Sequence, residues 1–325
     1  MAGQKIAVIV GPTACGKTDA SIRLAEALDA EIISADSIQV YRLLDIGSAK
    51  PTADQRRRVV HHMVDVVDLG DRGFSVARYR QSAQTCIDSV RKTGKLPLIV
   101  GGTGLYIHAL TQPLALGSVP PDEGLRMELV LKERNDPGCL HRMLGELDPA
   151  SALRLHPNDQ KRVIRALEVC MASGKPLSAY GSDFQNAAGN EPPNDAVMIG
   201  IAIPRELLYE RINARVDQMM EAGFLDEVKT LLKRGYDPSL PAFQGIGYRQ
   251  LLDHLDGRLT MGEAMEEIKR ETRRFAKRQI TWFKRDARIR WFNACDYPSS
   301  EEMHREMLEY LKFRLYEDIN DGCLS

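Results

Sequence analysis

The amino-acid sequence predicts an α/β protein, a doubly wound parallel sheet with a helical insertion, and two similar patterns support this prediction. The apolar run "KIAVIV" (5–10) leads into a glycine-rich turn and then into an amphipathic helix that ends near Asp29. The apolar run "LPLIV" (96–100) leads into a second glycine turn, "GGTG". Strand, glycine turn and helix in this order are typical of parallel sheets that are covered by helices on both faces.

Further elements lie between these two patterns. "EIISAD" (31–36) is expected to form a strand, and "HHMVDVVD" (61–68) a weaker one. The segment from 74 to 94 is expected to be a helix with Ser75 as its N-cap and Gly94 at its end. Ligands of such sheets bind at the carboxyl ends of the strands. We therefore expect the first glycine turn, Asp36 and the "GGTG" turn to converge on one cleft.

The pattern changes in the middle of the chain. Residues 113–195 contain helical segments separated by turn clusters such as "GSVPPDEG" and "GNEPPND", which predicts a helical insertion domain. The catalytic core is then expected to comprise residues 1–112 and 196–325. In its second part, "AVMIGIAI" (196–203) resumes the sheet and Arg205–Gly235 is expected to be one long helix. Thr260 and Glu263 form a capping box that opens a helix running to about Asp286.

The bulk composition excludes several classes of protein. The chain has 325 residues, of which 43% are hydrophobic, so a large core is possible. No apolar run reaches the roughly 20 residues that a membrane span needs, and the start "MAGQKIAVIVG" has no signal-peptide cleavage region. The six cysteines are scattered and form no zinc-binding pattern. These features predict a cytoplasmic protein without a membrane partner.

The first glycine turn carries the clearest motif. "GPTACGKT" (11–18) fits the phosphate-loop pattern G-x-x-x-x-G-K-S/T at every required position. Its backbone N–H groups and the following helix N-terminus favour phosphate oxygens, Lys17 adds charge, and the Thr18 hydroxyl is a candidate Mg²⁺ ligand. A nucleoside triphosphate such as ATP is the usual ligand of such a loop. The motif alone leaves the choice of phosphate compound open.

Charge is segregated towards the carboxyl-terminal part of the chain. The segment from Lys269 to Arg290 has ten basic residues and two acidic ones, although the whole chain has a net charge of −1. Such a cluster is typical of a face that binds a polyanion, and RNA is the expected partner. In a second interpretation the charges are only solvated, while Ile268, Phe275 and Trp282 form a buried stripe with a seven-residue spacing.

Seven motifs between Gly11 and Asp286 resemble the tRNA dimethylallyltransferase (tRNA isopentenyltransferase) family of bacterial type. They are "GPTACGKT", "DSIQVYRLLDIGSAKP", "GGTGLY", "HPNDQKRVIRALEV", "RVDQMMEAGFLDEV", "QGIGYRQ" and "KRQITWFKRD". The resemblance implies a P-loop NTPase-like fold and a monomer. It also implies transfer of a dimethylallyl group, with Mg²⁺, from dimethylallyl diphosphate to the adenosine amine (N6) adjacent to the anticodon on its 3′ side. The loop would then hold a diphosphate leaving group. Cys15 departs from the serine that is more frequent in the family.

The resemblance also implies the roles of individual residues. The catalytic residues would be Lys17, Thr18, Asp36, Thr103 and Arg215. The donor would be bound by Gly11, Pro12, Thr13, Ala14, Cys15, Gly16, Lys17 and Thr18. The anticodon stem-loop of tRNA would contact Asp36, Ser37, Ile38, Gln39, Thr103, Gln160, Lys161, Arg162, Val163, Ile164, Ala242, Phe243, Gln244, Gly245, Ile246, Gly247, Lys277, Arg278, Gln279, Trp282 and Lys284.

Chemistry leaves alternatives open for two of these residues. An adenine amine is a weak nucleophile, so a positioned base such as Asp36 would assist it. The alternatives for Asp36 at a strand end are a helix N-cap and a Mg²⁺ ligand, and the base is the favoured interpretation. Arg215 lies on a predicted helix, where a surface ion pair with an acid four residues away is an equally good interpretation from position alone.

Two rival functions remain at this stage. A small-molecule kinase would also use the phosphate loop, but the sequence has no arginine-rich lid between that loop and an acceptor site. A non-enzymatic RNA-binding protein with a relict loop would not need Lys17, Thr18 and Asp36 together. Transfer of label from ATP distinguishes the kinase from the transferase.

Overall fold

The computed structural model of the chain describes residues 5–112, 119, 122–180 and 194–320. Contacts between residues divide the chain into two units. The first unit comprises residues 1–111 and 192–325, and the second comprises residues 112–191. The insertion that we expect from the sequence, 113–195, overlaps the second unit. Each unit is described separately below.

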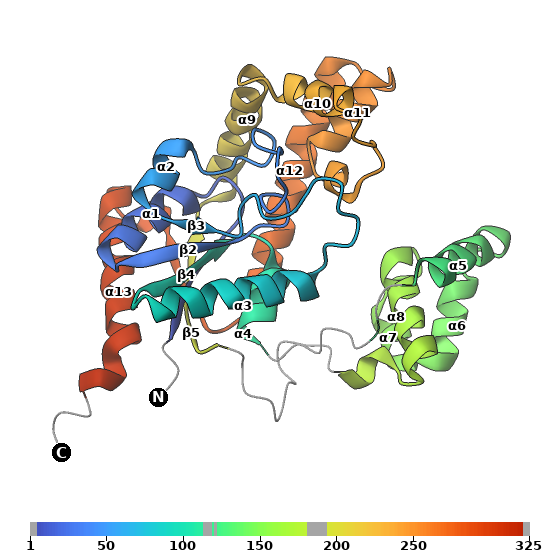
Figure 1. Cartoon of the computed structure of the whole chain (residues 1–325), viewed down its shortest axis with the longest axis horizontal. Helices are drawn as coiled ribbons and strands as arrows, with labels where there is room; N and C mark the ends of the chain where they lie inside the picture. The colour runs from blue at the N-terminus through green and yellow to red at the C-terminus, as the bar shows by residue number, and fades with distance from the viewer. Residues whose placement is uncertain (1–4, 113–118, 120–121, 181–193, 321–325) are drawn as a thin grey trace. The chain divides into compact units, whose positions relative to one another are not determined.

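The first unit contains a six-stranded sheet in which all neighbouring strands are parallel (Figure 1). The strand order is β3-β2-β4-β1-β5-β6. The strands are β1 (Ile6–Val10), β2 (Ala30–Ala35), β3 (His61–His62), β4 (Leu96–Gly101), β5 (Ala196–Ala202) and β6 (Ile289–Asn293). The α/β class and the parallel sheet predicted from the sequence are confirmed.

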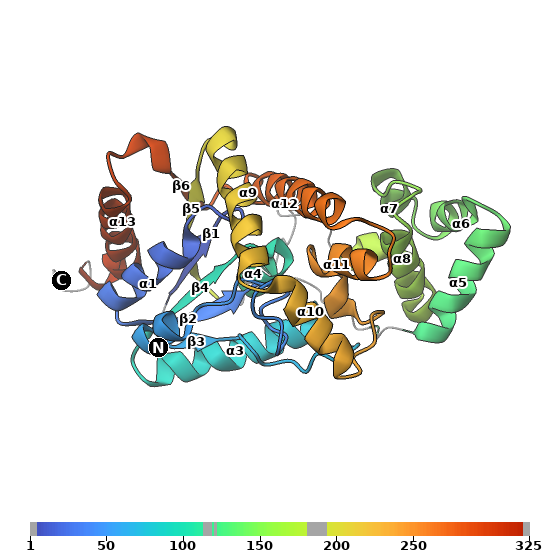
Figure 2. The same cartoon turned by 90° about the horizontal axis from the view of Figure 1, so that it is seen from above.

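Both faces of the sheet are buried. Along β1, the side chains of Ile6, Val8 and Val10 pack in one hydrophobic cluster, while Ala7 and Ile9 pack in another. Helices α3 (Val76–Lys92) and α4 (Gly104–Thr111) cover the first face, and α1 (Lys17–Ala27) and α13 (Ser300–Asn320) cover the second. Figure 2 shows α1 beside α13, and these two helices are in contact. This two-sided burial explains why the strands are apolar throughout.

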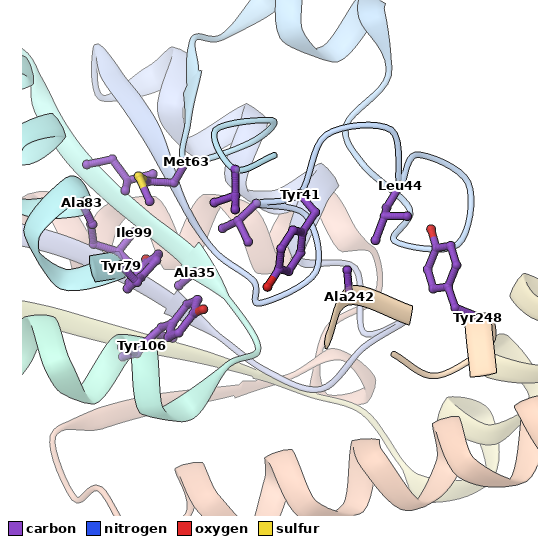
Figure 3. Packing of buried hydrophobic residues seen from close by; sticks show 14 of the residues in the cluster. Ala35, Tyr41, Leu44, Met63, Tyr79, Ala83, Ile99, Tyr106, Ala242 and Tyr248 are labelled. Carbon is purple, nitrogen blue, oxygen red and sulfur yellow. The ribbon is translucent and has the colours of Figure 1, made fainter. Parts of the chain in front are cut away.

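A pair of tyrosines supports the end of β2. The rings of Tyr79 and Tyr106 are stacked, with centroids 3.7 Å apart, in the cluster that also holds Ala35 and Ile99 (Figure 3). The Tyr79 hydroxyl donates a hydrogen bond of 3.0 Å to the Ser34 carbonyl. Burial raises the pKa of both phenols, so each keeps its proton as a donor. The Tyr79 hydroxyl therefore anchors the backbone of β2 two residues before Asp36.

Two predicted helix starts are confirmed. Ser75 caps α3, because its hydroxyl accepts a hydrogen bond from the Arg78 N–H. The capping box of Thr260 and Glu263 opens α12 (Met261–Phe283).

Two predictions about secondary structure are wrong. The strand at 61–68 is limited to His61–His62, because Met63 and Asp65 adopt positive φ angles of 60° and 59°. The long helix at 205–235 is two helices, α9 (Arg205–Glu221) and α10 (Phe224–Lys233). Gly223 separates them with a φ angle of 95°, which L-residues with a side chain rarely adopt.

The buried face of α12 also differs from the predicted stripe. Its buried residues are Ala264, Ile268, Ala276, Gln279 and Phe283. Phe275 and Trp282 are only half-buried. The spacing of three and four residues is that of an ordinary helix packed along one side, so the seven-residue stripe is wrong beyond Ile268.

Further elements complete the first unit. These are α2 (Ala53–Arg58), α11 (Tyr248–Leu255) and the short 3₁₀ segments Pro241–Gln244 and Ala294–Asp296. Within the described residues, no helix combines the length and the apolar character needed to cross a bilayer.

The structure describes residues 122–180 of the second unit as a continuous stretch, and every secondary-structure element in this stretch is a helix. Its helices are α5 (Glu123–Asn135), α6 (Cys139–Leu147), α7 (Pro149–Arg154) and α8 (Gln160–Ser173), followed by the 3₁₀ segment Leu177–Tyr180. Leu129, Leu140, Leu144, Val163 and Leu167 form its core.

A buried carboxylate joins α5 to α8. The fully buried Glu168 accepts hydrogen bonds from Arg126 Nε (3.0 Å) and Arg126 Nη2 (3.1 Å), from the Asp122 N–H (2.7 Å) and from Arg165. Burial alone would raise the pKa of Glu168, but these donors outweigh it and hold the pKa below its ordinary value. The carboxylate is therefore charged and fully satisfied, and Arg165 is committed to the protein.

Replacing Glu168 should destabilise the second unit. Glu168→Ala leaves two arginines without their buried partner, so we expect a loss of about 3–5 kcal/mol in the free energy of unfolding. Glu123→Ala is the matched control, because exposed Glu123 also pairs with Arg126, and it should cost less than about 1 kcal/mol. Urea unfolding with hydrogen exchange in α5 and α8 measures both. Equal effects of the two variants would contradict this account.

The stabilisation by Glu168 should also depend on pH. Because the folded-state pKa lies below the unfolded value, the contribution is complete above the unfolded pKa, about 4.3. It should decrease as the pH falls through the folded-state pKa.

Candidate active site

The carboxyl ends of three neighbouring strands open into one cavity of about 710 Å³. The glycine turn after β1, the Asp36 turn after β2 and the "GGTG" turn after β4 all line it, as expected from the sequence. Helices α9 and α12 complete its wall. Many predicted site residues meet here: Thr13, Ala14, Gly16, Lys17, Thr18, Asp36, Ser37, Ile38, Gln39, Thr103, Arg215, Gln244, Gly245, Ile246, Arg278 and Gln279.

The phosphate loop is folded around its lysine. Lys17 Nζ donates hydrogen bonds to the carbonyls of Gly11 (2.9 Å) and Pro12 (2.6 Å). Gly16 has a φ angle of 96° and forms the N-cap of α1, while Ala14 has a φ angle of 63°. No side chain caps this helix start, so its N–H groups are available to an anion.

Arg215 brings a second cation to the cavity from α9. Its side chain is half-buried, and no acidic group of the described chain lies within ion-pair distance of it. Burial lowers the pKa of Arg215, and the neighbouring charge of Asp36 and the Cys15 thiol oppose this. A guanidinium keeps its proton regardless, so a desolvated positive charge faces the cavity. The surface ion pair considered for Arg215 is absent from the described part of the chain.

The carboxylate of Asp36 is held by one oxygen. Asp36 Oδ1 accepts hydrogen bonds from the N–H groups of Ile38 (2.9 Å) and Gln39 (3.1 Å). No group in the described ranges donates to its other oxygen, Oδ2. Asp36 therefore caps a turn and not a helix, so the helix N-cap considered for it is wrong. The cap also orients the carboxylate and leaves Oδ2 free for a ligand.

Thr103 links the Asp36 turn to the turn after β4. Its hydroxyl oxygen accepts a hydrogen bond of 3.0 Å from the Ser37 N–H, and its own N–H donates to the Ala35 carbonyl at 3.1 Å. The hydroxyl also lines the cavity. Thr103 thus fixes the distance between two of the three converging turns.

The amide of Gln39 is engaged within the protein. Its oxygen accepts a hydrogen bond from the Ser34 hydroxyl (3.1 Å), and its nitrogen donates to the carbonyls of Ser48 and Ala49. These bonds occupy most of the groups that would read a base edge. The Gln39 oxygen keeps one acceptor position, so a base contact by this amide stays a prediction.

A carboxylate that the sequence analysis missed holds the adjoining loop. Glu227 on α10 accepts hydrogen bonds from the N–H groups of Asp45 (2.9 Å), Ile46 (2.7 Å) and Gly47 (3.3 Å), and from the Tyr248 hydroxyl (2.8 Å). The next residues of this loop, Ser48 and Ala49, line the cavity and hold Gln39. The only signal in the sequence was the position of Glu227 in the "RVDQMMEAGFLDEV" motif.

The cavity wall contains other residues that we did not predict. Arg211, Ile212, Val216 and Met219 lie beside Arg215 on α9, and Ile268, Thr272 and Phe275 precede Gln279 on α12. A spacing of three or four residues from Arg215 and Gln279 would have identified Arg211, Ile212, Met219 and Phe275, but not the others.

Several predicted RNA contacts and predicted donor contacts are buried or lie apart from the cavity lining. Ala242 and Phe243 are fully buried, and Val163 and Ile164 belong to the core of the second unit, so their side chains do not face RNA. Gln160, Lys161 and Arg162 are exposed on α8 of the second unit. Gly11, Pro12, Cys15, Gly247, Lys277, Trp282 and Lys284 do not line the cavity.

Comparisons with known proteins identify the family of this chain. A family model described as IPP transferase matches residues 39–286. A tRNA dimethylallyltransferase of Pelotomaculum thermopropionicum is 44% identical over 304 residues, which cover 94% of this chain and 95% of that protein. A tRNA dimethylallyltransferase of Thermotoga petrophila is 48% identical over 289 residues, which cover 89% of this chain and 92% of that protein.

Two solved structures are also similar to the structure of this chain. The full-length tRNA isopentenylpyrophosphate transferase of Bacillus halodurans has a TM-score of 0.73 and 40% identity, with 98% of this chain and 99% of that chain covered. A eukaryotic dimethylallyltransferase acting on tRNA has a TM-score of 0.77 and 27% identity, with 98% of this chain and 80% of that chain covered.

The unpaired Arg215 should bind an anionic ligand. We expect inorganic diphosphate to bind the cavity and Arg215→Met to weaken this binding about tenfold to a hundredfold, because a charge-assisted hydrogen bond is lost. Arg205→Met is the control, since Arg205 lies on the same helix but stacks on Tyr209 outside the cavity. Calorimetric titration measures both. A similar diphosphate affinity in both variants would exclude Arg215 from the anion site.

Proposed function

The chain belongs to the IPP transferase family, and from this membership we propose that it transfers a dimethylallyl group from dimethylallyl diphosphate to tRNA. The acceptor is the exocyclic amine of the adenosine on the 3′ side of the anticodon. One observation carries the proposal: a single cavity contains an anion-binding loop with two cations and, beside them, a carboxylate with a free oxygen. A leaving group and a base therefore have places in the same cavity.

The reaction is a substitution at the first carbon of the dimethylallyl group. The adenosine amine forms the new N–C bond, and the C–O bond to the diphosphate breaks. The diphosphate leaves with the electron pair, and the amine proton moves to Asp36 Oδ2. Because Oδ1 is already occupied by two N–H donors, the carboxylate keeps one orientation during this transfer.

Negative charge increases on the diphosphate as the C–O bond breaks. The N–H groups of the phosphate loop after Thr13, the ammonium of Lys17 and the guanidinium of Arg215 are the groups that stabilise it. These donors are held in place before the reaction, so little reorganisation is needed.

Magnesium belongs to the same proposal. Mg²⁺ is usually held by one or two protein oxygens together with substrate phosphates. The described residues contain no cluster of three His, Cys, Asp or Glu side chains, and the Thr18 hydroxyl lines the cavity, so the donor set fits this mode. Thr18 would hold the ion, which would neutralise part of the diphosphate charge.

The exposed part of α12 and the residues 284–288 that follow it form the proposed RNA surface of the first unit. Lys269, Arg270, Arg274 and Arg288 form ion pairs with acidic residues. Lys277, Arg278, Lys284 and Arg285 are exposed and have no acidic partner in the described ranges. Unpaired cations at this density favour a phosphate backbone. Gln160, Lys161 and Arg162 are the candidate contacts in the second unit.

The rival functions lose support. A kinase needs a nucleoside triphosphate, whereas the family members compared above are named for transfer to tRNA. A relict loop has no use for unpaired Arg215 or for an oriented Asp36. A cytoplasmic location and a monomeric state remain part of the proposal.

Incubation of the protein with labelled dimethylallyl diphosphate, Mg²⁺ and unmodified tRNA tests the function. We expect label in the adenosine next to the anticodon after nucleoside analysis, without ATP. An obligatory requirement for ATP, or label transferred from its γ-phosphate, would support the kinase instead.

Asp36→Asn tests the role of the carboxylate. The amide keeps the shape and one acceptor oxygen but does not take the proton, so the chemical step should slow by about 10²–10⁴ while tRNA affinity stays within a few-fold. Single-turnover rates at saturating donor, tRNA and Mg²⁺ measure this step. A near wild-type rate under these conditions would leave Asp36 as a metal ligand.

Lys284→Ala tests the RNA surface. Loss of one phosphate contact should lower the slope of log affinity against log salt by about one unit without changing donor affinity. Lys269→Ala is the control, because Lys269 already pairs with Asp217 at 2.7 Å, and its effect on the slope should be smaller. Equal slopes for wild type and Lys284→Ala would remove Lys284 from the RNA surface.

A further inference from the structure

The side chain of Gln279 joins two of the turns that form the cavity. Gln279 lies on α12 and is 6% exposed. Its oxygen accepts a hydrogen bond of 2.9 Å from the Thr13 N–H in the phosphate loop. Its nitrogen donates a hydrogen bond of 2.9 Å to the Gly102 carbonyl in the turn after β4. Both ends of the amide are therefore bound to backbone groups of different turns.

The turn after β4 is shaped to receive this amide. A Cβ atom at Gly102 would lie 2.1 Å from Gln279 Nε2, which is too close for any side chain. A Cβ atom at Gly104 would lie 2.2 Å from the indole of Trp282, the next turn along α12. The two glycines thus allow α12 to pack directly on the "GGTG" turn.

The phosphate loop has a strained residue directly after the point where Gln279 holds it. Ala14 has a φ angle of 63°, which is uncommon for a residue with a side chain. Such a conformation persists only where the surroundings determine it. The hydrogen bond to the Thr13 N–H fixes the Pro12–Thr13 peptide, which lies one peptide before the bond that leads into Ala14. It also commits this N–H to the protein, so the anion-facing donors of the loop come from the residues after Thr13.

We propose that Gln279 is a positioning residue for the donor site. By holding Thr13 and Gly102 at a fixed separation, it keeps the phosphate loop in the conformation that binds diphosphate. This role rests on the proposed function, and it replaces the sequence-based interpretation that Gln279 contacts tRNA. Its neighbour Arg278 lines the cavity, and Lys277 and Lys284 are exposed, so one helix carries both the RNA surface and the support of the loop.

Gln279→Met tests the proposal, because methionine has a similar length but cannot make either hydrogen bond. The dissociation constant for inorganic diphosphate should rise about tenfold or more, since two buried backbone groups lose their partner and the loop is released. The dissociation constant for unmodified tRNA should stay within about twofold of wild type. Titration of the full-length protein with each probe separates the two effects.

Gln250→Met is the matched control. Gln250 is also a buried glutamine that accepts a hydrogen bond from a backbone N–H, that of Gly247, but it touches neither turn. It should leave diphosphate affinity unchanged. If loss of any buried glutamine bond lowered diphosphate affinity, the effect would reflect stability, and the positioning role would be overturned.

A second variant, at Gly102, tests the same contact between Gln279 and the turn after β4. Gly102→Ala places a methyl group where the amide lies, so it should weaken diphosphate binding in the same way. The double variant Gln279→Ala with Gly102→Ala should be no weaker than Gln279→Ala alone, because both changes remove one contact. Additive losses would contradict the proposal.

Other outcomes are equally decisive. Gln279→Met with normal diphosphate binding and tRNA binding weakened more than about fivefold would make Gln279 an RNA contact and overturn the proposal. A wild-type protein that does not bind diphosphate would contradict the donor assignment itself. Wild type and Gln279→Met binding diphosphate equally would contradict the positioning role alone.

Discussion

The parallel pairing of β2, β4 and β1 is the constraint on which the site depends. Gly101 at the end of β4 is the register partner of both Val10 on β1 and Ala35 on β2. The three strands therefore end at the same level, and the residues that follow them begin their turns side by side. A shift of any strand by one residue would separate the phosphate loop from Asp36. The chemistry is thus a consequence of strand register, and the helices that follow add the remaining groups.

Hydrogen bonds from outside the sheet then set the shape of each turn. Thr103 connects the Asp36 turn to the turn after β4, Gln279 connects that turn to the phosphate loop, and Glu227 holds the loop that anchors Gln39. These polar side chains are satisfied by backbone groups, which makes the site rigid. In contrast, the Arg215 guanidinium and Asp36 Oδ2 line the cavity without a hydrogen-bond or ion-pair partner in the described residues. Polar groups without a partner cost stability, which is why we place Arg215 and Asp36 in the proposed reaction.

Much of this arrangement could be predicted from the sequence, because glycine turns after apolar runs report directly on strand ends. The parallel sheet, the cavity-lining turns and the capped starts of α3 and α12 follow from such local signals. The break at Gly223 and the positive φ angles of Met63 and Asp65 were missed, since single residues of this kind act against a longer periodic pattern. The hydrogen bonds that Gln39 and Gln279 make within the protein were also missed. A sequence pattern shows that a polar residue is present, but only the packed structure shows which partners it already has.

A crystal structure of the protein with an unmodified anticodon stem-loop and a thiolodiphosphate analogue of the donor tests the central claim most directly. We expect the diphosphate to contact the loop Gly11–Thr18 and Arg215, with the adenosine amine about 3 Å from Asp36 Oδ2. A diphosphate bound elsewhere, or an adenosine amine that faces another base while Asp36 is turned away from it, would contradict the account.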